Sequence, residues 1–392
     1  MISPLNILLV SVLAYYVYNH YKTNFAPFIN ISPVKTTLAK DTCEVIKGPV
    51  GCEDIIIPKG ENFGIFACGQ DILFKKIWGG SKYTALSKNP LKQEELDKFY
   101  HYDLETSKLI EISVKNIPKG HTFGVHGFDM IADPENKDNY LLYVVNHMRN
   151  SSETVVKFHY DSIKKELNWF GTEYGTPGSL INPNGLVFLD VDNYLVTGPT
   201  KYQTELMIYA QVLGFFRGGL ITHFSPSDIS IISESVYFAN GIVPSKDGKL
   251  LFVASSLDAS VAVFKISKNK KKQIEFSYYD KIPVDAIPDN LNIDHETGDI
   301  FVAGMTSITE FFGYVTSPGL PTKDQNVGFR IIRIQIGKNA EDKNKYEFRT
   351  ETVLEHDGTI HKMATVAAPH SKLNRVLIGS LFSDEVLNCK IN

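Results

Sequence analysis

The stretch Ala239–Val243, which reads Ala-Asn-Gly-Ile-Val and leads through a polar turn to the apolar run Leu250–Val253, carries the pattern that decides the fold. Similar stretches begin at Asn184 and Asn290, and a related one begins at His126. They recur roughly every 50–60 residues, which is close to the length of one four-stranded propeller blade. Equivalent positions at the start of each inner strand face a central channel. The sequence therefore predicts an all-β propeller in which these distant stretches meet.

The side chains predicted to meet at the channel carry oxygen and neither sulfur nor imidazole. They are two carboxylates and three amides: Glu53, Asn184, Asn240, Asp289 and Asn290. Hard oxygen ligands suit calcium, whereas transition metals recruit histidine or cysteine. Because a single Asn-Gly or Asp-Asn pair also makes an ordinary turn, the prediction of a calcium site depends on all five lying on one repeat.

Two histidines lie at the ends of neighbouring predicted strands. His126 begins one strand, a polar turn follows at 134–138, and His147 ends the return strand. Two imidazoles near a bound calcium can form a proton relay, in which one activates water and the other accepts its proton. The alternative is that each histidine only satisfies a buried hydrogen bond.

Composition narrows the class of protein. The chain has 392 residues, 43% of them hydrophobic, so it can bury a large core. Its net charge of −4 gives no electrostatic reason to expect a nucleic-acid partner, and we expect none. The GxSxG, HExxH and GxGxxG motifs of other enzyme classes are absent from the sequence.

The N-terminus begins with an uncharged apolar segment, Pro4–Tyr18, and the first basic residue is Lys22. The segment is short for a full span of about twenty residues, and no small-x-small cleavage site follows it. We predict that residues 1–20 form an uncleaved signal-anchor or membrane-associating helix, with a cleaved signal peptide as the alternative. Either version directs the chain into the secretory pathway. Residues 21–392 would then form a propeller on the lumenal or extracellular side, membrane-anchored or free.

The four cysteines fit an oxidising compartment, because none has the CxxC spacing of a zinc or redox site. A disulfide between Cys43 and Cys389 would join the first and last strands and close the ring. Cys52 and Cys68 either pair across the first hairpin or remain buried thiols. Two sequons provide candidate glycosylation sites, at Asn30 and Asn150.

Seven stretches together resemble the paraoxonase/arylesterase family. They are residues 51–54, 126–128, 141–147, 182–185, 238–242, 289–299 and 377–382. They fall in order and cover nearly the whole chain from Cys43 onward. The resemblance implies a six-bladed β-propeller with calcium in a central tunnel, an N-terminal apolar helix, and calcium-dependent hydrolysis of lactones and aryl esters.

The resemblance also assigns roles by position. It implies that the five oxygen residues named above hold the catalytic calcium, that His126 and His147 form a histidine dyad, and that Cys43 pairs with Cys389. A second, structural calcium would use Asp54 and the backbone carbonyl of Phe128. The family has an acidic side chain where this chain has Gly185, so the second ion is left open.

Two further segments bear on partners and substrates. Met207–Phe216 resembles the family's second membrane-facing helix, and its alternative is an ordinary core helix. Met305 stands where the family usually has a histidine, which makes the pocket more apolar. The expected partners are a small ester or lactone substrate and a membrane or lipid surface reached through the N-terminal helix.

The sequence thus predicts a calcium-dependent arylesterase and lactonase, in which His126 activates water, His147 relays the proton and calcium stabilises the oxyanion. The alternative is a membrane-tethered accessory or chaperone protein for membrane channels, in which calcium is only structural. Gly185 and Met305 are compatible with the alternative. The complete set of five oxygen residues with both histidines favours the hydrolase.

Overall fold

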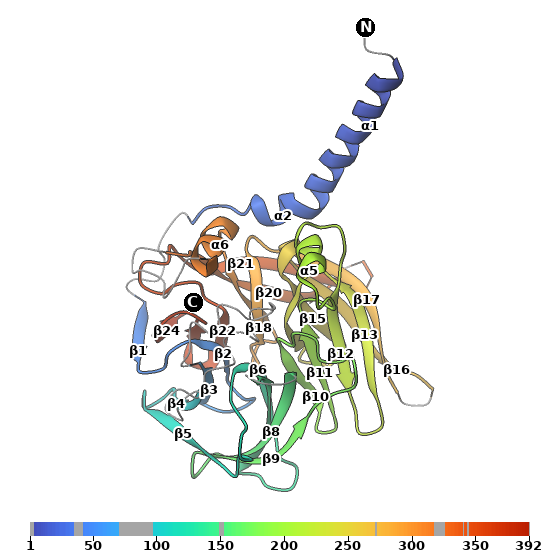
Figure 1. Cartoon of the computed structure of the whole chain (residues 1–392). Coiled ribbons are helices and arrows are strands. Elements are labelled where there is room, and N and C mark those ends of the chain that lie inside the picture. Colours follow the sequence, from blue (N-terminus) through green and yellow to red (C-terminus); the bar gives the residue numbers. More distant parts are fainter. Residues whose placement is uncertain are drawn as a thin grey trace.

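The structure is a computed structural model that describes residues 4–34, 42–69, 97–148, 153–270, 273–316, 326–339, 341–342 and 345–391. Within these ranges the strands form four four-stranded sheets and one eight-stranded sheet (Figure 1). The eight-stranded sheet consists of two antiparallel groups of four, joined by the parallel pair β5–β9. The prediction of an all-β, propeller-like fold is confirmed.

We number the six four-stranded groups as units in chain order. Unit 1 contains β2 (Cys52–Ile56), β3 (Phe63–Cys68), β4 (Lys98–Asp103) and β5 (Leu109–Lys115). Unit 2 contains β6 (Val125–Ala132), β7 (Asn139–His147), β8 (Glu153–Asp161) and β9 (Glu166–Glu173). Unit 3 contains β10 (Leu186–Asp190), β11 (Asn193–Gly198), β12 (Gly219–Phe224) and β13 (Ile229–Val236).

The second half of the chain repeats the arrangement. Unit 4 contains β14 (Ala239–Pro244), β15 (Leu250–Ser255), β16 (Ser260–Lys268) and β17 (Ile274–Pro283). Unit 5 contains β18 (Ile287–Ile293), β19 (Ile300–Met305), β20 (Phe329–Lys338) and β21 (Tyr346–His356). Unit 6 contains β22 (Val366–His370), β23 (Arg375–Gly379), β24 (Glu385–Lys390) and, from the other end of the chain, β1 (Cys43–Lys47).

The units form a closed ring. Their first strands contact one another in the cycle β2, β6, β10, β14, β18, β22 and back to β2. A buried hydrophobic cluster fills each interface between neighbouring units, with members such as Ile65 and Phe158, Val155 and Tyr194, Leu195 and Phe264, Phe252 and Ile332, Ile331 and Leu387, and Leu377 and Phe66. Each fully buried side chain of this size contributes roughly 1.5–3 kcal/mol. Strands such as β15 are therefore buried on both faces and are apolar except for a terminal residue, Ser255.

The ring closes through the N-terminal strand. β1 pairs antiparallel with β24, with Cys43 opposite Cys389, and these two cysteines form a disulfide. Cys52 and Cys68, whose state the sequence left open, are also opposite each other and disulfide-bonded. Both bonds therefore reinforce pairings that the sheet already makes.

The N-terminus forms helix α1 (Pro4–His20), a π-helical turn at Tyr21–Phe25 and the short helix α2 (Ala26–Ile29). α1 projects away from the body of the molecule (Figure 1). No helix in the described ranges is both long and apolar enough to span a membrane.

A buried arginine ties the N-terminal segment to the ring. Arg330, 3% exposed, donates from Nε to Glu355 Oε2 at 2.8 Å and from Nη2 to the carbonyl oxygen of Pro33 at 2.9 Å. Its Nη1 donates to the carbonyl of Asp285 at 2.8 Å, and Asp285 Oδ1 in turn accepts from the backbone N–H of Ser32. These bonds hold the segment that follows α2 against unit 5.

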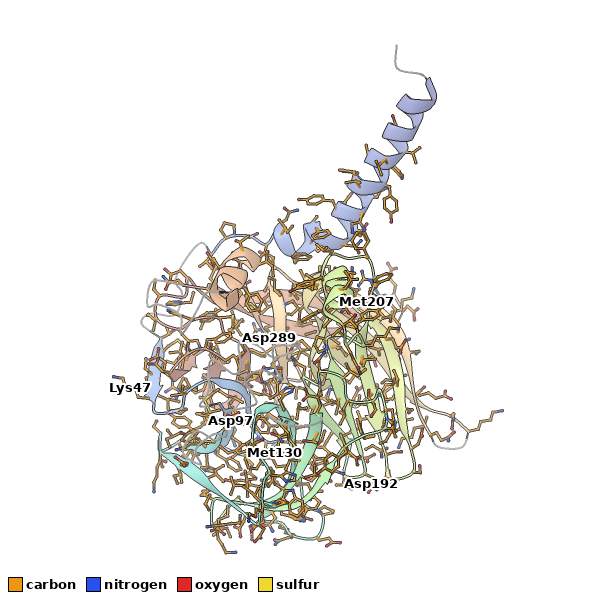
Figure 2. The ribbon with its side chains drawn as sticks, viewed as in Figure 1. Lys47, Asp97, Met130, Asp192, Met207 and Asp289 are labelled. Atoms are coloured by element: carbon orange, nitrogen blue, oxygen red, sulfur yellow. A yellow bond between two sulfur atoms is a disulfide. The ribbon has the colours of Figure 1, made fainter. Side chains whose placement is uncertain are left out.

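Two more helices, α5 (Glu205–Val212) and α6 (Ile308–Thr316), lie on the same side of the ring as α2 (Figure 1). Leu206 is 78% exposed and Tyr209 63% exposed, and Leu213, Phe215 and Phe216 beyond the helix are also exposed. Figure 2 shows neighbouring Met207 at this edge of the molecule. The alternative that Met207–Phe216 is a core helix is wrong.

We expect the two disulfides to differ in their contribution to stability. The chain-entropy model gives about 6 kcal/mol for the 346-residue separation of Cys43 and Cys389 and about 3 kcal/mol for the 16-residue separation of Cys52 and Cys68. Urea unfolding of the Cys43→Ala/Cys389→Ala double variant should therefore show the larger loss. The Cys52→Ala/Cys68→Ala variant is the matched control, and an equal or larger loss there would contradict the expectation.

A second expectation concerns acid. His361, in the connection between β21 and β22, is fully buried with its ring edge against Phe329. Burial, with His356 nearby, lowers its pKa to about 4. Since the unfolded chain takes up this proton near pH 6.5, stability should fall as the pH drops from about 6.5 towards 4, by at most about 3 kcal/mol. Unfolding free energies of the His361→Gln variant should show a shallower pH slope; an unchanged slope would refute this assignment.

Candidate active site

The five oxygen residues predicted from the sequence lie together at one end of the inner strands. Glu53 and Asn240 are the second residues of β2 and β14, Asp289 and Asn290 lie within β18, and Asn184 precedes β10 by two residues. None of the five is more than 8% exposed. Residues separated by up to 237 positions in the chain thus share one buried region.

β-bulges in four inner strands position these side chains. The pairing register shifts between Cys52 and Asp54 in β2, between Ala239 and Ile242 in β14, and between Pro288 and Leu291 in β18. β6 has the same irregularity between Val125 and Phe128. A bulge adds one residue to one strand and redirects its side chains. Glu53, His126, Asn240, Asp289 and Asn290 all lie inside these interruptions.

Glycines allow the inner strands to touch at the same level. A Cβ atom on Gly127 would lie 2.4 Å from the carbonyl oxygen of Asn184, and one on Gly241 would lie 2.5 Å from Cα of Asn290. A Cβ on Gly185 would be 3.0 Å from the carbonyl oxygen of Asn240. Each of these three glycines therefore leaves room for an asparagine of the next unit, which a residue with a side chain could not do.

Hydrogen bonds connect the polar side chains of the site. Asn290 Nδ2 donates to Glu53 Oε1 at 2.8 Å and to the carbonyl oxygen of Glu53 at 3.1 Å. The amide of Asn240 donates to the carboxyl group of Asp289. The side-chain oxygens of Asn184 and Asn240 are buried and accept no hydrogen bond from any residue in the described ranges. Buried acceptors without donors are costly.

The two carboxylates add negative charge to the same region. Burial, and after it the neighbouring Glu53, raise the pKa of Asp289 well above its usual value, which the hydrogen bond from Asn240 partly opposes. No lysine or arginine of the described ranges forms an ion pair with Asp289. Two buried carboxyl groups at close range require either protonation or a cation.

This set of donors fits calcium. The described residues contain no group of three or more His, Cys, Asp and Glu arranged for a metal, because three of the five oxygens here come from amides. Calcium accepts carboxylate and amide oxygens in irregular geometry. A divalent cation would satisfy the amide oxygens of Asn184 and Asn240 and offset the charge on Glu53 and Asp289.

The two histidines form a chain of hydrogen bonds that leads to these oxygens. His126 Nδ1 lies 2.8 Å from His147 Nε2, and His147 Nδ1 lies 2.5 Å from Glu153 Oε2. At the other end, His126 Nε2 is 3.5 Å from Glu53 Oε1. Because a carboxylate only accepts, His147 donates from Nδ1 and accepts at Nε2, so His126 donates from Nδ1. His126 Nε2 is then the basic nitrogen, and it faces the candidate calcium site.

Glu153 is a member of this chain that the sequence reading missed. It is the first residue of β8 and stands directly opposite His147 in the β7–β8 ladder. Asn146, next to His147, fixes the segment before β6, because its Oδ1 accepts from the N–H of Gly124 and its Nδ2 donates to the carbonyl of Thr122. The sequence does offer one indication of this partner, because Glu153 follows His147 by only six residues and begins the next strand.

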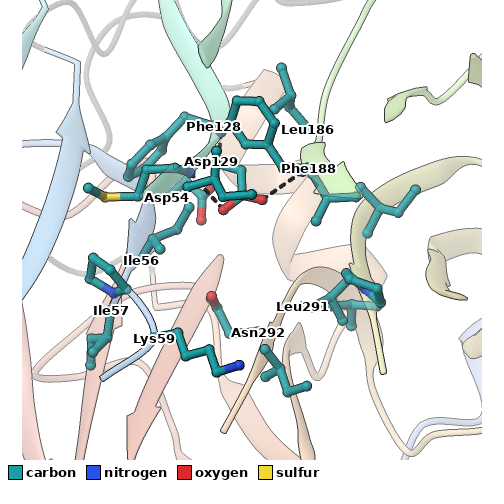
Figure 3. A pocket seen from close by; sticks show the side chains of 18 of the residues that line it. Asp54, Ile56, Ile57, Lys59, Phe128, Asp129, Leu186, Phe188, Leu291 and Asn292 are labelled. Atoms are coloured by element: carbon teal, nitrogen blue, oxygen red, sulfur yellow. Dashed lines mark hydrogen bonds between the residues drawn. The ribbon is translucent and has the colours of Figure 1, made fainter. Parts of the chain in front are cut away.

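The predicted second ion site contains an acid that was also missed. Asp54 accepts from the backbone N–H groups of Ile55 and Phe128, and Asp129 accepts from those of Met130 and Phe188. Burial raises the pKa of Asp129 to about 7, and burial with Glu53 nearby raises that of Asp54. Figure 3 shows the two carboxyl groups pointing towards each other. Asp129 therefore supplies a carboxylate near the position where Gly185 supplies none.

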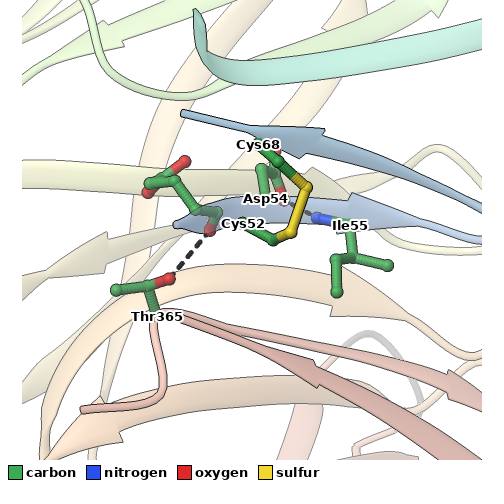
Figure 4. The surroundings of a disulfide bond; sticks show 6 residues. Cys52, Asp54, Ile55, Cys68 and Thr365 are labelled. Carbon is green, nitrogen blue, oxygen red and sulfur yellow. Dashed lines mark hydrogen bonds between the residues drawn. A yellow bond between two sulfur atoms is a disulfide. The ribbon is translucent and has the colours of Figure 1, made fainter. Parts of the chain in front are cut away.

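The disulfide between Cys52 and Cys68 lies beside the same site. Cys52 precedes Glu53 in β2, and Thr365 of the sixth unit donates from its hydroxyl to the carbonyl oxygen of Glu53 at 2.9 Å (Figure 4). The strand that carries Glu53 is thus held from both sides.

Three other predicted positions are not among these oxygen and histidine residues. Met305, at the end of β19, is 7% exposed and packs with Phe28 of α2, Tyr237 and Leu257. Asn30 is exposed just after α2. Asn150 lies outside the described residues.

Comparison with known proteins gives the following matches. The family model Arylesterase matches residues 77–391. Human serum paraoxonase/arylesterase 1 is 26% identical over 382 residues, covering 95% of this chain and 94% of its own. Rabbit (Oryctolagus cuniculus) serum paraoxonase/lactonase 3 is 24% identical over 375 residues, covering 92% and 91%.

Solved structures with a similar fold are more distant. A luciferin-regenerating enzyme has 13% identity and a TM-score of 0.48, with 89% of this chain and 95% of that chain covered. The calcium-binding protein regucalcin from Agrobacterium tumefaciens has 9% identity and a TM-score of 0.46, with 88% and 94% covered.

The unpartnered amide oxygens lead to a prediction about calcium and stability. A ligand present at a hundred times its Kd stabilises the folded state by about 2.7 kcal/mol, so calcium should raise the Tm and chelation should lower it. The Asn240→Ala variant should lose at least half of this calcium-dependent rise, as followed by scanning calorimetry. Asn269→Ala, on the exposed β16–β17 hairpin, is the matched control. An equal rise in both variants would count against a site at Asn240.

Proposed function

The chain belongs to the arylesterase family, and we propose that it hydrolyses aryl esters and lactones in a calcium-dependent reaction. The observation that carries this proposal is the chain from Glu153 through His147 to His126, which ends beside the five converging oxygens. A purely structural metal site has no need for an oriented imidazole next to it. The names of the relatives, paraoxonase, arylesterase and lactonase, support the same class of substrate.

When bound, calcium supplies positive charge for the carbonyl oxygen of the substrate and for the oxyanion that forms on attack. Glu53, Asn184, Asn240, Asp289 and Asn290 would hold it. Asn290 orients Glu53 by donating to both its side chain and its backbone. The side-chain amide of Asn240 donates to the carboxyl group of Asp289. The amide nitrogens thus hold the carboxylates, and the amide oxygens remain available as ligands.

The proton moves along the histidine chain. His126 Nε2 accepts the proton of the attacking water as the oxygen bonds to the carbonyl carbon, and the tetrahedral intermediate then breaks its carbon–oxygen bond to the leaving alcohol or phenol, which takes up the proton. His126 can then pass its Nδ1 proton to His147 Nε2 across 2.8 Å. Glu153 stabilises the positive charge that develops on His147. His126 is thus the general base, and Glu153 is a positioning residue.

An apolar cluster next to the site supports aryl and alkyl substrates. Met305, Phe28, Tyr237 and Ile287 pack together there, with Phe238 partly buried against them. Ile287 and Phe238 lie within two residues of Asp289 and Asn240. A wall of this kind favours substrates with an apolar acyl or leaving group.

We also propose that the six units are the six blades of one propeller domain over residues 21–392, and that the helical side docks on a membrane or lipid surface. α1 and the segment after α5 are adjacent, because His20 Nε2 bonds the carbonyl of Leu213 at 2.9 Å and the His20 ring stacks on Phe215. Both elements expose aromatic and aliphatic side chains. With two disulfides, this fits a chain in the secretory pathway or outside the cell.

A second, structural calcium is part of the proposal. Asp54 and the carbonyl of Phe128 would hold it, with Asp129 as an additional carboxylate. Burial is the main reason that the pKa values of both acids are raised. A bound cation would lower them again.

The experiment is hydrolysis of phenyl acetate and of a simple lactone by the full chain, with calcium and after chelation. We expect activity that chelation removes and calcium restores. His126→Gln should lower kcat by about 10²–10⁴, because it removes the general base. His223→Gln, a half-buried histidine in unit 3, is the matched control and should keep full activity.

Two further variants separate catalysis from structure. Glu153→Gln should lower kcat and change the pH profile, while leaving the calcium-dependent rise in Tm intact. If the folded chain shows that rise in Tm but hydrolyses neither substrate, the enzyme proposal fails. The accessory role at membrane channels, with calcium structural, would then take its place.

A further inference from the structure

A cavity of about 340 Å³ extends from the site along the ring axis, away from the helices. Its inner end is lined by Asp54, Asp129 and Asn290 (Figure 3). Its outer end reaches Lys59 and His295, which follow the last residues of β2 and β18. Lys59 and Ala132 are exposed, so the cavity reaches solvent at this end.

The wall between the two ends is apolar. The inner strands of five units contribute to it, with Ile56, Met130, Val187, Val243 and Leu291. A cavity of this size with a few polar groups at its ends has the usual properties of a small-molecule site. Neither the calcium ligands nor the histidine chain accounts for the apolar part.

The outer end is positively charged. A neighbouring groove of about 420 Å³ shares Lys59 and His295 with the cavity and adds Lys246 and Lys268, with Asp190 as the single acid among its lining residues. Lys246 Nζ donates to the backbone carbonyl of Glu296 at 2.7 Å, which holds its charge at the mouth. Burial and the neighbouring Lys59 lower the pKa of His295 and Asp294 raises it, while Lys246 and Glu296 act with smaller effects of opposite sign.

We propose that the cavity and groove form a second binding site, for a small amphiphilic carboxylate, that shares only Asn290 with the residues assigned to catalysis and to the catalytic calcium. Its alkyl chain occupies the apolar cavity and its carboxylate lies at the mouth near Lys59 and Lys246. The lysines at the outer end decide the orientation, because they attract the carboxylate to the mouth while the alkyl chain is buried between the apolar walls. The inference does not depend on the proposed hydrolysis.

The test is isothermal titration calorimetry of the full chain with octanoate, hexanoate, octanol and octylammonium, each below the concentration at which it forms micelles. We expect saturable binding of octanoate with one site per chain. Two methylenes at about 0.8 kcal/mol each should make octanoate bind on the order of tenfold more tightly than hexanoate. Octanol and octylammonium should bind more weakly than octanoate.

Variants locate the site. Ala132→Trp, at the exposed end of β6, should abolish octanoate binding by filling the mouth. Lys59→Gln should weaken octanoate binding about five- to tenfold without weakening octanol. Lys249→Gln, an exposed lysine that pairs with Asp247 and lines neither cavity, is the matched control and should bind as the native chain does.

Two results would overturn the proposal. Octanoate binding that survives Ala132→Trp would belong to the exposed apolar helices. Tighter binding of octylammonium than of octanoate would mean that the inner acids, and not the lysines at the mouth, determine the ligand.

Discussion

Close contact between inner strands is the constraint on which the rest of this structure depends. At Gly127, Gly185 and Gly241 even one added carbon atom would meet the backbone of the next unit at 3.0 Å or less. The carbonyl of Asn184 accepts from the N–H of Gly127, and that of Asn240 accepts from the hydroxyl of Thr197. These bonds run from unit to unit at one level of the ring. The strands cannot move apart there without losing them.

The same contact brings the chemistry together. Asn184 and Asn240 precede two of these glycines, Gly241 lies against Asn290, and Asn290 bonds Glu53, so a close-packed ring brings their oxygens together. The fold then contains buried carboxylates and unpartnered amide oxygens, an arrangement that is unfavourable without a cation. Stability and function are therefore linked at the candidate site, as is common where local rules of folding are broken. The hydrophobic clusters between units and the two disulfides provide the stability that offsets this cost.

Polarity changes along the axis of the ring. At one end lie the helices, the apolar cluster around Met305 and the five oxygen residues. Asp54 and Asp129 follow, then an apolar section, and finally the lysines of the far mouth. Successive residues of each inner strand point in alternate directions, so one strand contributes to several of these zones. β2 alone supplies Glu53, Asp54 and Ile56.

Asp129 and Glu153 are two acids of the site that the sequence did not predict. Strict alternation from His126 does not predict that Asp129 joins Asp54, because the bulge in β6 changes the direction of the residues that follow it. Glu153 is six residues from His147, and only the pairing of β7 with β8 places the two side chains within 2.5 Å. Cys52 and Cys68 were undecided for the same reason, since their separation in sequence allows a bond but does not require one.

The sequence by itself predicted the all-β class, the repeat and the five oxygen residues, because a blade-length period, with an Asn-Gly or Asp-Asn step in three of its copies, is local information. Cysteine number and spacing also fit an oxidising compartment. The tertiary structure alone decided which atoms face one another: the chain from Glu153 through His147 to His126, the partner of each carboxylate, and the cavity beyond Asp54. Those contacts join residues up to hundreds of positions apart through bulges and strand register, which no local pattern in the chain records.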